Sequence, residues 1–110
     1  MQVPTVAIDG VPNPLPEGLV VLDVREQIEW DAGHIDGALH IPMSELMERV
    51  DEVGFDQTLV VCKVGGRSAQ ATAWLASQGR DVVNLDGGML DWEAAGRPMV
   101  SSTGQAPQVF

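Results

Sequence analysis

The sequence predicts an α/β fold in which a mostly parallel β-sheet is flanked by helices. Short aliphatic runs alternate along the chain with amphipathic or alanine-rich segments, which is the pattern of repeated strand and helix units. Two of these runs, LVVL at 19–22 and LVV at 59–61, contain no alternating polar residues. Strands of this kind are buried on both faces, so both runs are expected near the centre of the sheet.

Five segments are predicted to form the strands. The first contains Pro4, which cannot donate a backbone hydrogen bond, so we expect this strand at an edge of the sheet. The fourth ends in the only cysteine of the chain, Cys62. The five segments are VPTVAI (3–8), LVVLD (19–23), ALHI (38–41), TLVVC (58–62) and DVVNL (81–85).

Four further segments are predicted to be helical. The second begins at Ser44, a residue suited to the N-cap, and its apolar residues recur at helical spacing. The third is rich in alanine, a strong helix former, and is followed by Gly79 in the C-cap position. The four segments are at about 26–32, 44–53, 67–78 and 88–95. The apolar residues expected on one face of the second are Leu46, Met47, Val50 and Val53.

Length and composition predict a single domain. A chain of 110 residues with 45% hydrophobic content can bury a core without disulfides or metals. We assign residues 16–100 to the body of the domain, and residues 1–15 to an N-terminal edge strand and turn of the same domain. The tail, residues 101–110, is rich in proline, glycine and polar residues and is expected to be weakly ordered.

Charge and segment composition exclude several kinds of partner. A net charge of −10 repels nucleic acid and anionic lipid, and solubility is favoured as its role over the docking of a basic protein partner. No apolar run approaches the roughly 20 residues that cross a bilayer, so no membrane insertion is expected. The sequence lacks nucleotide-binding patterns, and no cofactor is expected. With one cysteine and no signal-peptide pattern, the chain is expected in the cytoplasm.

The position of Cys62 marks it as a candidate nucleophile. Ligands bind at the carboxyl ends of strands in open α/β sheets, and Cys62 ends a predicted central strand. The glycines that follow, Gly65 and Gly66, allow successive backbone amides to point towards the sulfur. A helix that starts near Arg67 adds partial positive charge, and Lys63 adds a second cation. Such surroundings lower the pKa of a thiol and bind small anions.

Other interpretations of Cys62 are less favoured. A free cysteine is commonly a small buried hydrophobe, but here the glycine turn and the cations favour a reactive thiol. A cysteine protease with His34 or His40 as the base is disfavoured because nothing else in so short a chain builds a peptide cleft. The spacing of Cys62 and these histidines matches no usual zinc pattern, so no metal site is expected.

Three motifs in order resemble those of the rhodanese-domain sulfurtransferases. The segment CKVGGRS (62–68) resembles the active-site loop of that family, in which a cysteine is followed by Lys or Arg, a glycine, and an Arg with Ser or Thr. VLDVREQIEWDAGHIDGALHIP (21–42) resembles the first family signature, and LDGGMLDWEAAGRP (85–98) resembles the closing segment. The resemblance implies a five-stranded parallel sheet with helices on both faces.

The resemblance also implies a chemistry for this chain. Cys62 would accept sulfane sulfur from thiosulfate or a persulfide and pass it to cyanide or a thiol, with ping-pong kinetics. The substrate-binding loop would consist of Lys63, Val64, Gly65, Gly66, Arg67 and Ser68. Its amides would hold the persulfide while Lys63 and Arg67 attract a small anionic donor. An alternative is a carrier or interaction module that exchanges sulfur with proteins and turns over little thiosulfate.

Loop length disfavours a cysteine phosphatase or an arsenate reductase. Four residues separate Cys62 from Arg67, whereas the phosphatases of related fold use a loop one residue longer around a tetrahedral phosphate. A shorter ring fits a single sulfur atom better. Val61 also stands where those phosphatases carry histidine before the cysteine.

Several other residues are candidates for supporting roles at the same sheet edge. Asp23 and Arg25 follow the second predicted strand and could orient the loop or the substrate, although a structural ion pair is favoured. Gly87 and Gly88 follow the last strand, where a tight turn is favoured over a direct role and Met89 could line the pocket.

The histidines and tryptophans are expected to be structural. His34 is expected in a turn and His40 is expected to be partly buried. The tryptophans, expected in packing rather than ligand stacking, are Trp30, Trp74 and Trp92.

Overall fold

The computed structural model describes residues 3–110. Residues 1 and 2 of the predicted N-terminal segment lie outside this range. The strands are β1 (Thr5–Val6), β2 (Val20–Asp23), β3 (Leu39–His40), β4 (Thr58–Val61) and β5 (Val82–Leu85). The α-helices are α1 (Gln27–Ala32), α2 (Gly66–Ser77) and α3 (Gly88–Ala94). Short 3₁₀ turns are η1 (Ile8–Gly10), η2 (Met43–Glu45) and η3 (Val50–Glu52).

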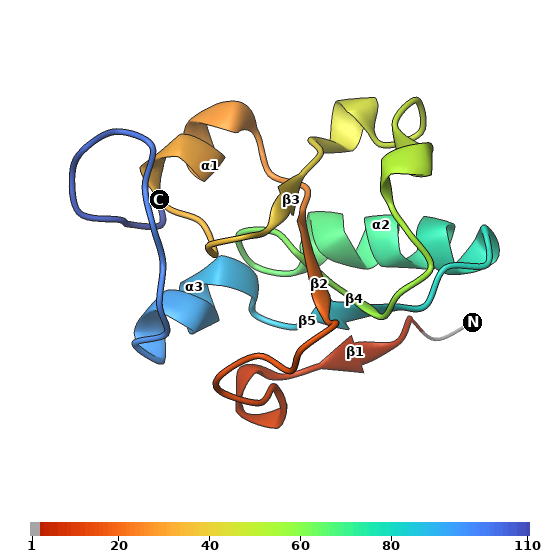
Figure 1. The fold of residues 1–110 in the computed structure, drawn as a ribbon, viewed down its shortest axis with the longest axis horizontal. Coiled ribbons are helices and arrows are strands. Elements are labelled where there is room, and N and C mark those ends of the chain that lie inside the picture. Colours follow the sequence, from red (N-terminus) through yellow and green to blue (C-terminus); the bar gives the residue numbers. More distant parts are fainter. Residues whose placement is uncertain (1–2) are drawn as a thin grey trace.

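The strands form one five-stranded parallel sheet in the order β1-β5-β4-β2-β3. The predicted α/β class is therefore confirmed, as are the edge position of β1 and the central positions of β2 and β4 (Figure 1). Because β4 pairs with β2 on one side and β5 on the other, its carboxyl end lies in the middle of the ligand-binding edge. Cys62 follows β4 directly.

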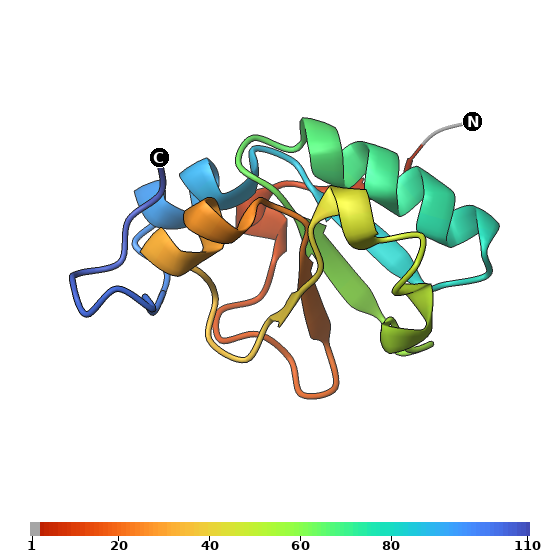
Figure 2. The same ribbon diagram turned by 90° about the horizontal axis from the view of Figure 1, so that it is seen from above.

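Side chains of β4 alternate between two apolar clusters, one on each face of the sheet. Val60 and Cys62 belong to the cluster that Leu75 of α2 completes. Val61 belongs to the other cluster, with Met89 of α3. Helices thus cover both faces, and Figure 2 shows α2 as the long helix apart from α1 and α3.

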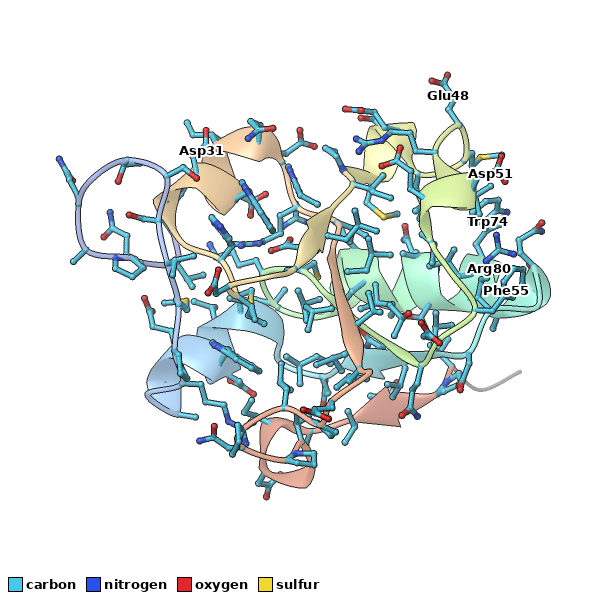
Figure 3. All side chains as sticks on the ribbon, viewed as in Figure 1. Asp31, Glu48, Asp51, Phe55, Trp74 and Arg80 are labelled. Atoms are coloured by element: carbon cyan, nitrogen blue, oxygen red, sulfur yellow. The ribbon has the colours of Figure 1, made fainter. Side chains whose placement is uncertain are left out.

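The predicted helix at 44–53 is wrong. The segment forms η2, a turn and η3, and Met47 is 72% exposed although helical spacing placed it on the apolar face. The Arg80 side chain donates to the carbonyl oxygens of Val53 (3.0 Å) and Val50 (3.4 Å), and Leu46 and Val53 still reach the core cluster from this irregular segment. Figure 3 shows Arg80 beside Phe55, over whose ring its guanidinium lies.

The C-terminal segment makes specific contacts with two helices. The Ser102 amide donates to the Asp31 carbonyl (2.8 Å) and the Gln108 amide donates to the Ala32 carbonyl (3.0 Å). The Val109 amide donates to the Glu93 carboxylate of α3 (2.9 Å). The segment therefore has defined partners where the sequence indicated weak packing, and its weak order in solution stays a prediction.

Within residues 3–110, no helix is both long enough and apolar enough to span a membrane.

Candidate active site

Cys62 is a free cysteine held at the centre of the sheet edge. Its side chain is 1% exposed, and its carbonyl oxygen accepts a hydrogen bond from the Met89 amide at 2.8 Å. The next carbonyl, of Lys63, accepts from the Leu90 amide at 3.0 Å. The first turn of α3 therefore holds the carbonyl groups of Cys62 and Lys63, the two residues at which the loop begins.

The loop after Cys62 folds back towards the sulfur. Gly65 has a φ of 107°, which favours glycine because it lacks a Cβ atom, and α2 begins at the next residue. The Gly65 amide donates to Cys62 Sγ at 3.1 Å, and the Ser68 hydroxyl lies 3.3 Å from the same atom. The predicted approach of loop amides to the sulfur is thus present in the structure.

Asn84 of β5 is a buried partner of Ser68 that sequence reasoning missed. Its side-chain amide lies within hydrogen-bond distance of the Ser68 hydroxyl. The Ser68 hydroxyl donates to Asn84 Oδ1 at 2.5 Å and lies 3.3 Å from Cys62 Sγ, and because a hydroxyl has one proton these two acceptors compete for it. The signal in the sequence was a lone amide residue inside the aliphatic strand DVVNL.

These contacts determine the direction in which the pKa of Cys62 shifts. Burial raises the pKa of the thiol, because a charged sulfur is poorly solvated there. Hydrogen bonds from the Ser68 hydroxyl and from the amides of Ser68, Gly65 and Val64 outweigh burial, and the pKa lies below its ordinary value. The thiolate therefore persists to lower pH than in an ordinary cysteine.

Substituting Ser68→Ala is expected to raise the pKa of Cys62. The change removes the side-chain hydrogen bond that stabilises the thiolate and leaves the amide of residue 68 in place. The rate of iodoacetamide alkylation followed against pH should show its midpoint at higher pH than in the wild type. Ser77→Ala, on the same helix but bonded to the Trp74 carbonyl and the Gln78 side chain, is the control and should leave the midpoint unchanged. An unchanged midpoint in the Ser68 variant would contradict this role.

The Gly87–Gly88 turn borders the loop more closely than the sequence indicated. Gly88 has a φ of 55°, and a Cβ atom added there would lie 2.4 Å from the Cys62 carbonyl oxygen. Gly65 faces the same turn, since a Cβ atom on it would lie 3.3 Å from the Gly87 amide nitrogen. The loop and this turn therefore pack backbone against backbone.

Asp23 and Arg25 form a buried ion pair. Arg25 is 0% and Asp23 1% exposed, and Arg25 donates to both carboxylate oxygens at 2.7–3.1 Å. Arg25 also donates to the carbonyl oxygens of Gly33 (2.7 Å) and Glu29 (3.4 Å). The pair thus fastens β2 to both ends of α1, and this geometry agrees with the structural interpretation rather than contact with a substrate.

Arg67 is also ion-paired. Its two terminal nitrogens donate to the two carboxylate oxygens of Glu29, at 2.7 and 2.9 Å. Within residues 3–110, Lys63 takes part in none of the ion pairs. Sequence reasoning identified both cations but missed Glu29, because nothing local relates residue 29 to residue 67.

The two histidines enclose Trp30 in a stack of three rings. The ring centroids of Trp30 lie 3.7 Å from His34 and 4.6 Å from His40, with nearly parallel planes. His34 Nδ1 donates to the Trp30 carbonyl and His40 Nε2 donates to the Arg25 carbonyl, both at 2.7 Å. Met89 is fully buried and packs in the apolar cluster that contains Val61.

The fold and this site define a class of proteins. A parallel sheet presents a cysteine at the end of its central strand, and the cysteine lies inside a loop of amides at the start of a helix. Residues 10–95 match the model of the rhodanese-like domain family. The chain belongs to this family.

Similar proteins show the same relationship. The chain is 41% identical over 80 residues to the thiosulfate sulfurtransferase GlpE of Pseudomonas putida, an alignment that covers 71% of this chain and 73% of GlpE. It is 40% identical over 78 residues to the putative sulfur carrier protein YrkF of Bacillus subtilis, covering 69% of this chain. A crystal structure of a rhodanese-related protein from Thermoplasma volcanium superposes with a TM-score of 0.83 and 32% identity, covering 88% of this chain and 97% of that one.

The relatives differ in length from this chain. The chain spans 42% of the length of YrkF, so that protein contains a large part with no counterpart here.

Proposed function

We propose that the protein is a sulfurtransferase in which Cys62 carries sulfane sulfur as a persulfide. The observation that supports this best is the ring of donors around one sulfur atom: the Gly65 amide at 3.1 Å and the Ser68 hydroxyl at 3.3 Å from Cys62 Sγ. Such donors stabilise a thiolate before the reaction and a sulfur anion after it. Membership of the rhodanese-like family supports the same conclusion.

The reaction proceeds in two transfers on one nucleophile. The Cys62 thiolate attacks the outer sulfur of thiosulfate, a bond forms between the two sulfurs, and the sulfur–sulfur bond of the donor breaks. Its electron pair leaves with sulfite. Cyanide or a thiolate then attacks the outer sulfur of the persulfide, and the Cys62 thiolate is released. No external oxidant or cofactor is required, and ping-pong kinetics follow.

The loop residues have separate roles in this proposal. The amides from Lys63 to Ser68 surround the bound sulfur, and the positive end of α2 adds to their effect. Lys63 attracts an anionic donor, and Arg67 contributes charge that Glu29 partly neutralises. Asp23 and Arg25 act indirectly, by fixing α1 beside the loop. A thiol that has to remain reduced between turnovers fits a cytoplasmic location.

Mass spectrometry of the intact protein tests this function. After incubation with thiosulfate and removal of excess reagent, the wild type should gain the mass of one sulfur atom, and cyanide should remove it. Cys62→Ser should gain nothing, since it lacks the nucleophile. Uptake that persists in Cys62→Ser, or no uptake by the wild type from any sulfane-sulfur donor, would refute the proposal.

A second candidate is a carrier that exchanges persulfide sulfur with other proteins. It is favoured by the net charge of −10, which suits a basic donor or acceptor protein, and by the similarity to YrkF. Steady-state kinetics separate the two candidates. Fast conversion of cyanide to thiocyanate with thiosulfate alone supports the enzyme, whereas sulfur loading without appreciable turnover supports the carrier.

A further inference from the structure

Glu29 contacts the loop through Arg67 but takes part in neither transfer step of the proposed reaction. Its carboxylate and the Arg67 guanidinium form a bidentate pair, the geometry in which such pairs are strongest. Glu29 is 12% exposed and Arg67 36% exposed. This contact is therefore a partly buried part of the site rather than a loose surface pair.

The position of Glu29 is fixed by its own helix. Its Oε1 atom also accepts a hydrogen bond from the Glu26 amide at 3.0 Å, which completes a capping box at the start of α1. Its carbonyl oxygen accepts from Arg25, whose side chain is fully buried. Arg67 is thus held by a rigid partner, and its charge is opposed whenever Glu29 is ionised.

The same pair acts on the charge around Cys62. Hydrogen bonds from Arg67 hold the pKa of Glu29 below its usual value despite burial, so the carboxylate is charged at neutral pH. Arg67 lies near enough to Cys62 for the negative charge of the thiolate to raise the pKa of Arg67, which favours the charged guanidinium. A carboxylate paired with this guanidinium therefore offsets part of the attraction that Arg67 exerts on an anionic donor.

Exposed apolar residues occur on the loop and on the two helices that contact it. Val64, at the tip of the loop, is 57% exposed, and Ile28, next to Glu29 in α1, is 69% exposed. Leu90, whose amide is bonded to Lys63, is 36% exposed. An organic group on a donor would find contacts here that inorganic thiosulfate cannot use.

We infer that Glu29 is a specificity-determining residue that makes the site prefer singly charged organic sulfane-sulfur donors over dianions such as thiosulfate. Through its ion pair it reduces the net positive charge that Arg67 offers, and the apolar rim favours the organic part of the donor. This inference rests on the proposed function, since it concerns the donor of the same Cys62 persulfide.

Glu29→Gln tests the inference with two donors of nearly the same shape. Thiosulfate carries two negative charges, whereas methanethiosulfonate replaces one charged oxygen with a methyl group and carries one; attack by Cys62 on its outer sulfur releases methanesulfinate. The variant keeps an oxygen for the Glu26 amide but removes the charge opposite Arg67. KM for thiosulfate is expected to fall on the order of tenfold and that for methanethiosulfonate about threefold, because the attraction scales with donor charge. The kcat values should change little.

Two further variants isolate the effect of the Glu29 charge on the preference between the two donors. Asp31→Asn removes one carboxylate from the same helix without touching Arg67, and Figure 3 shows Asp31 at α1. This variant should leave the preference between the two donors unchanged. In an Arg67→Ala background, Glu29→Gln should still shift the preference towards thiosulfate, because the Glu29 charge then acts on the donor without an opposing guanidinium. The effect of Glu29→Gln should also shrink as salt is raised from about 0.02 to 0.5 M, since screening weakens it.

The outcomes distinguish this inference from the proposed function. If Cys62 accepts sulfur from neither donor, the proposed function fails. If Cys62 is loaded but Glu29→Gln leaves the donor preference unchanged, or if Asp31→Asn changes it equally, the function stands and the role of Glu29 is overturned.

Discussion

Arg25→Met is expected to lower the free energy of unfolding by about 3–5 kcal/mol, because it leaves the Asp23 carboxylate buried without its partner. Arg25 is fully buried, and its guanidinium also supplies hydrogen bonds to carbonyls at both ends of α1. Urea unfolding followed by circular dichroism measures the change. The variant should unfold at a much lower urea concentration than the wild type.

A matched control and a double variant test the cause of this loss. Arg49→Met removes a partly exposed arginine that also pairs with carboxylates, those of Glu45 and Glu52, and should have little effect. Asp23→Asn combined with Arg25→Met should recover part of the stability, since no charge then remains buried. If Arg25→Met and Arg49→Met unfold alike, burial of the charge is not what makes Arg25 important.

Gly88→Ala is expected to destabilise the protein by about 2–5 kcal/mol and to distort the site. The new Cβ atom would lie 2.4 Å from the Cys62 carbonyl oxygen and 2.6 Å from that of Lys63, so one backbone has to move. Movement would break the hydrogen bonds that these carbonyls accept from the first turn of α3. Urea unfolding gives the loss of stability, and sulfur loading of the folded variant gives the loss at the site.

Gly37→Ala separates the clash from the backbone strain. Gly37 has a φ of 81°, in the same left-handed region, but a Cβ atom there would meet nothing within 4 Å. Its substitution should cost only the conformational penalty, about 1–2 kcal/mol, and should leave sulfur loading intact. Equal effects of the two substitutions would show that contact with the Cys62 loop contributes nothing.

The sequence predicted the parts of the fold that depend on local pattern. Aliphatic runs predicted the buried strands β2 and β4, and the alanine content predicted the helix α2. The glycine turn indicated that Cys62 lies between β4 and α2. The segment 44–53 forms two 3₁₀ turns instead of a helix, although Leu46 and Val53 are buried as the spacing predicted. Helical periodicity identified these two residues as buried but not the backbone conformation that buries them.

The candidate site was predictable to the same degree. The cysteine, its glycines and its cations lie next to one another in the sequence, so their proximity needed no tertiary information. Asn84 and Glu29 come from β5 and α1 and meet the loop only once the sheet has formed. The contact of Asn84 with the Ser68 hydroxyl and the contact of Glu29 with the Arg67 guanidinium could not be predicted from the loop sequence alone.

The place of β4 between two neighbouring strands has a consequence for partly destabilised molecules. Local openings of a protein start at edges and loops, and the central strands separate only when the whole domain unfolds. The Cys62 backbone follows such a strand and is bonded to α3, so it should open last. Under heat or urea, the strand that carries Cys62 should then separate from the sheet only in molecules that unfold as a whole.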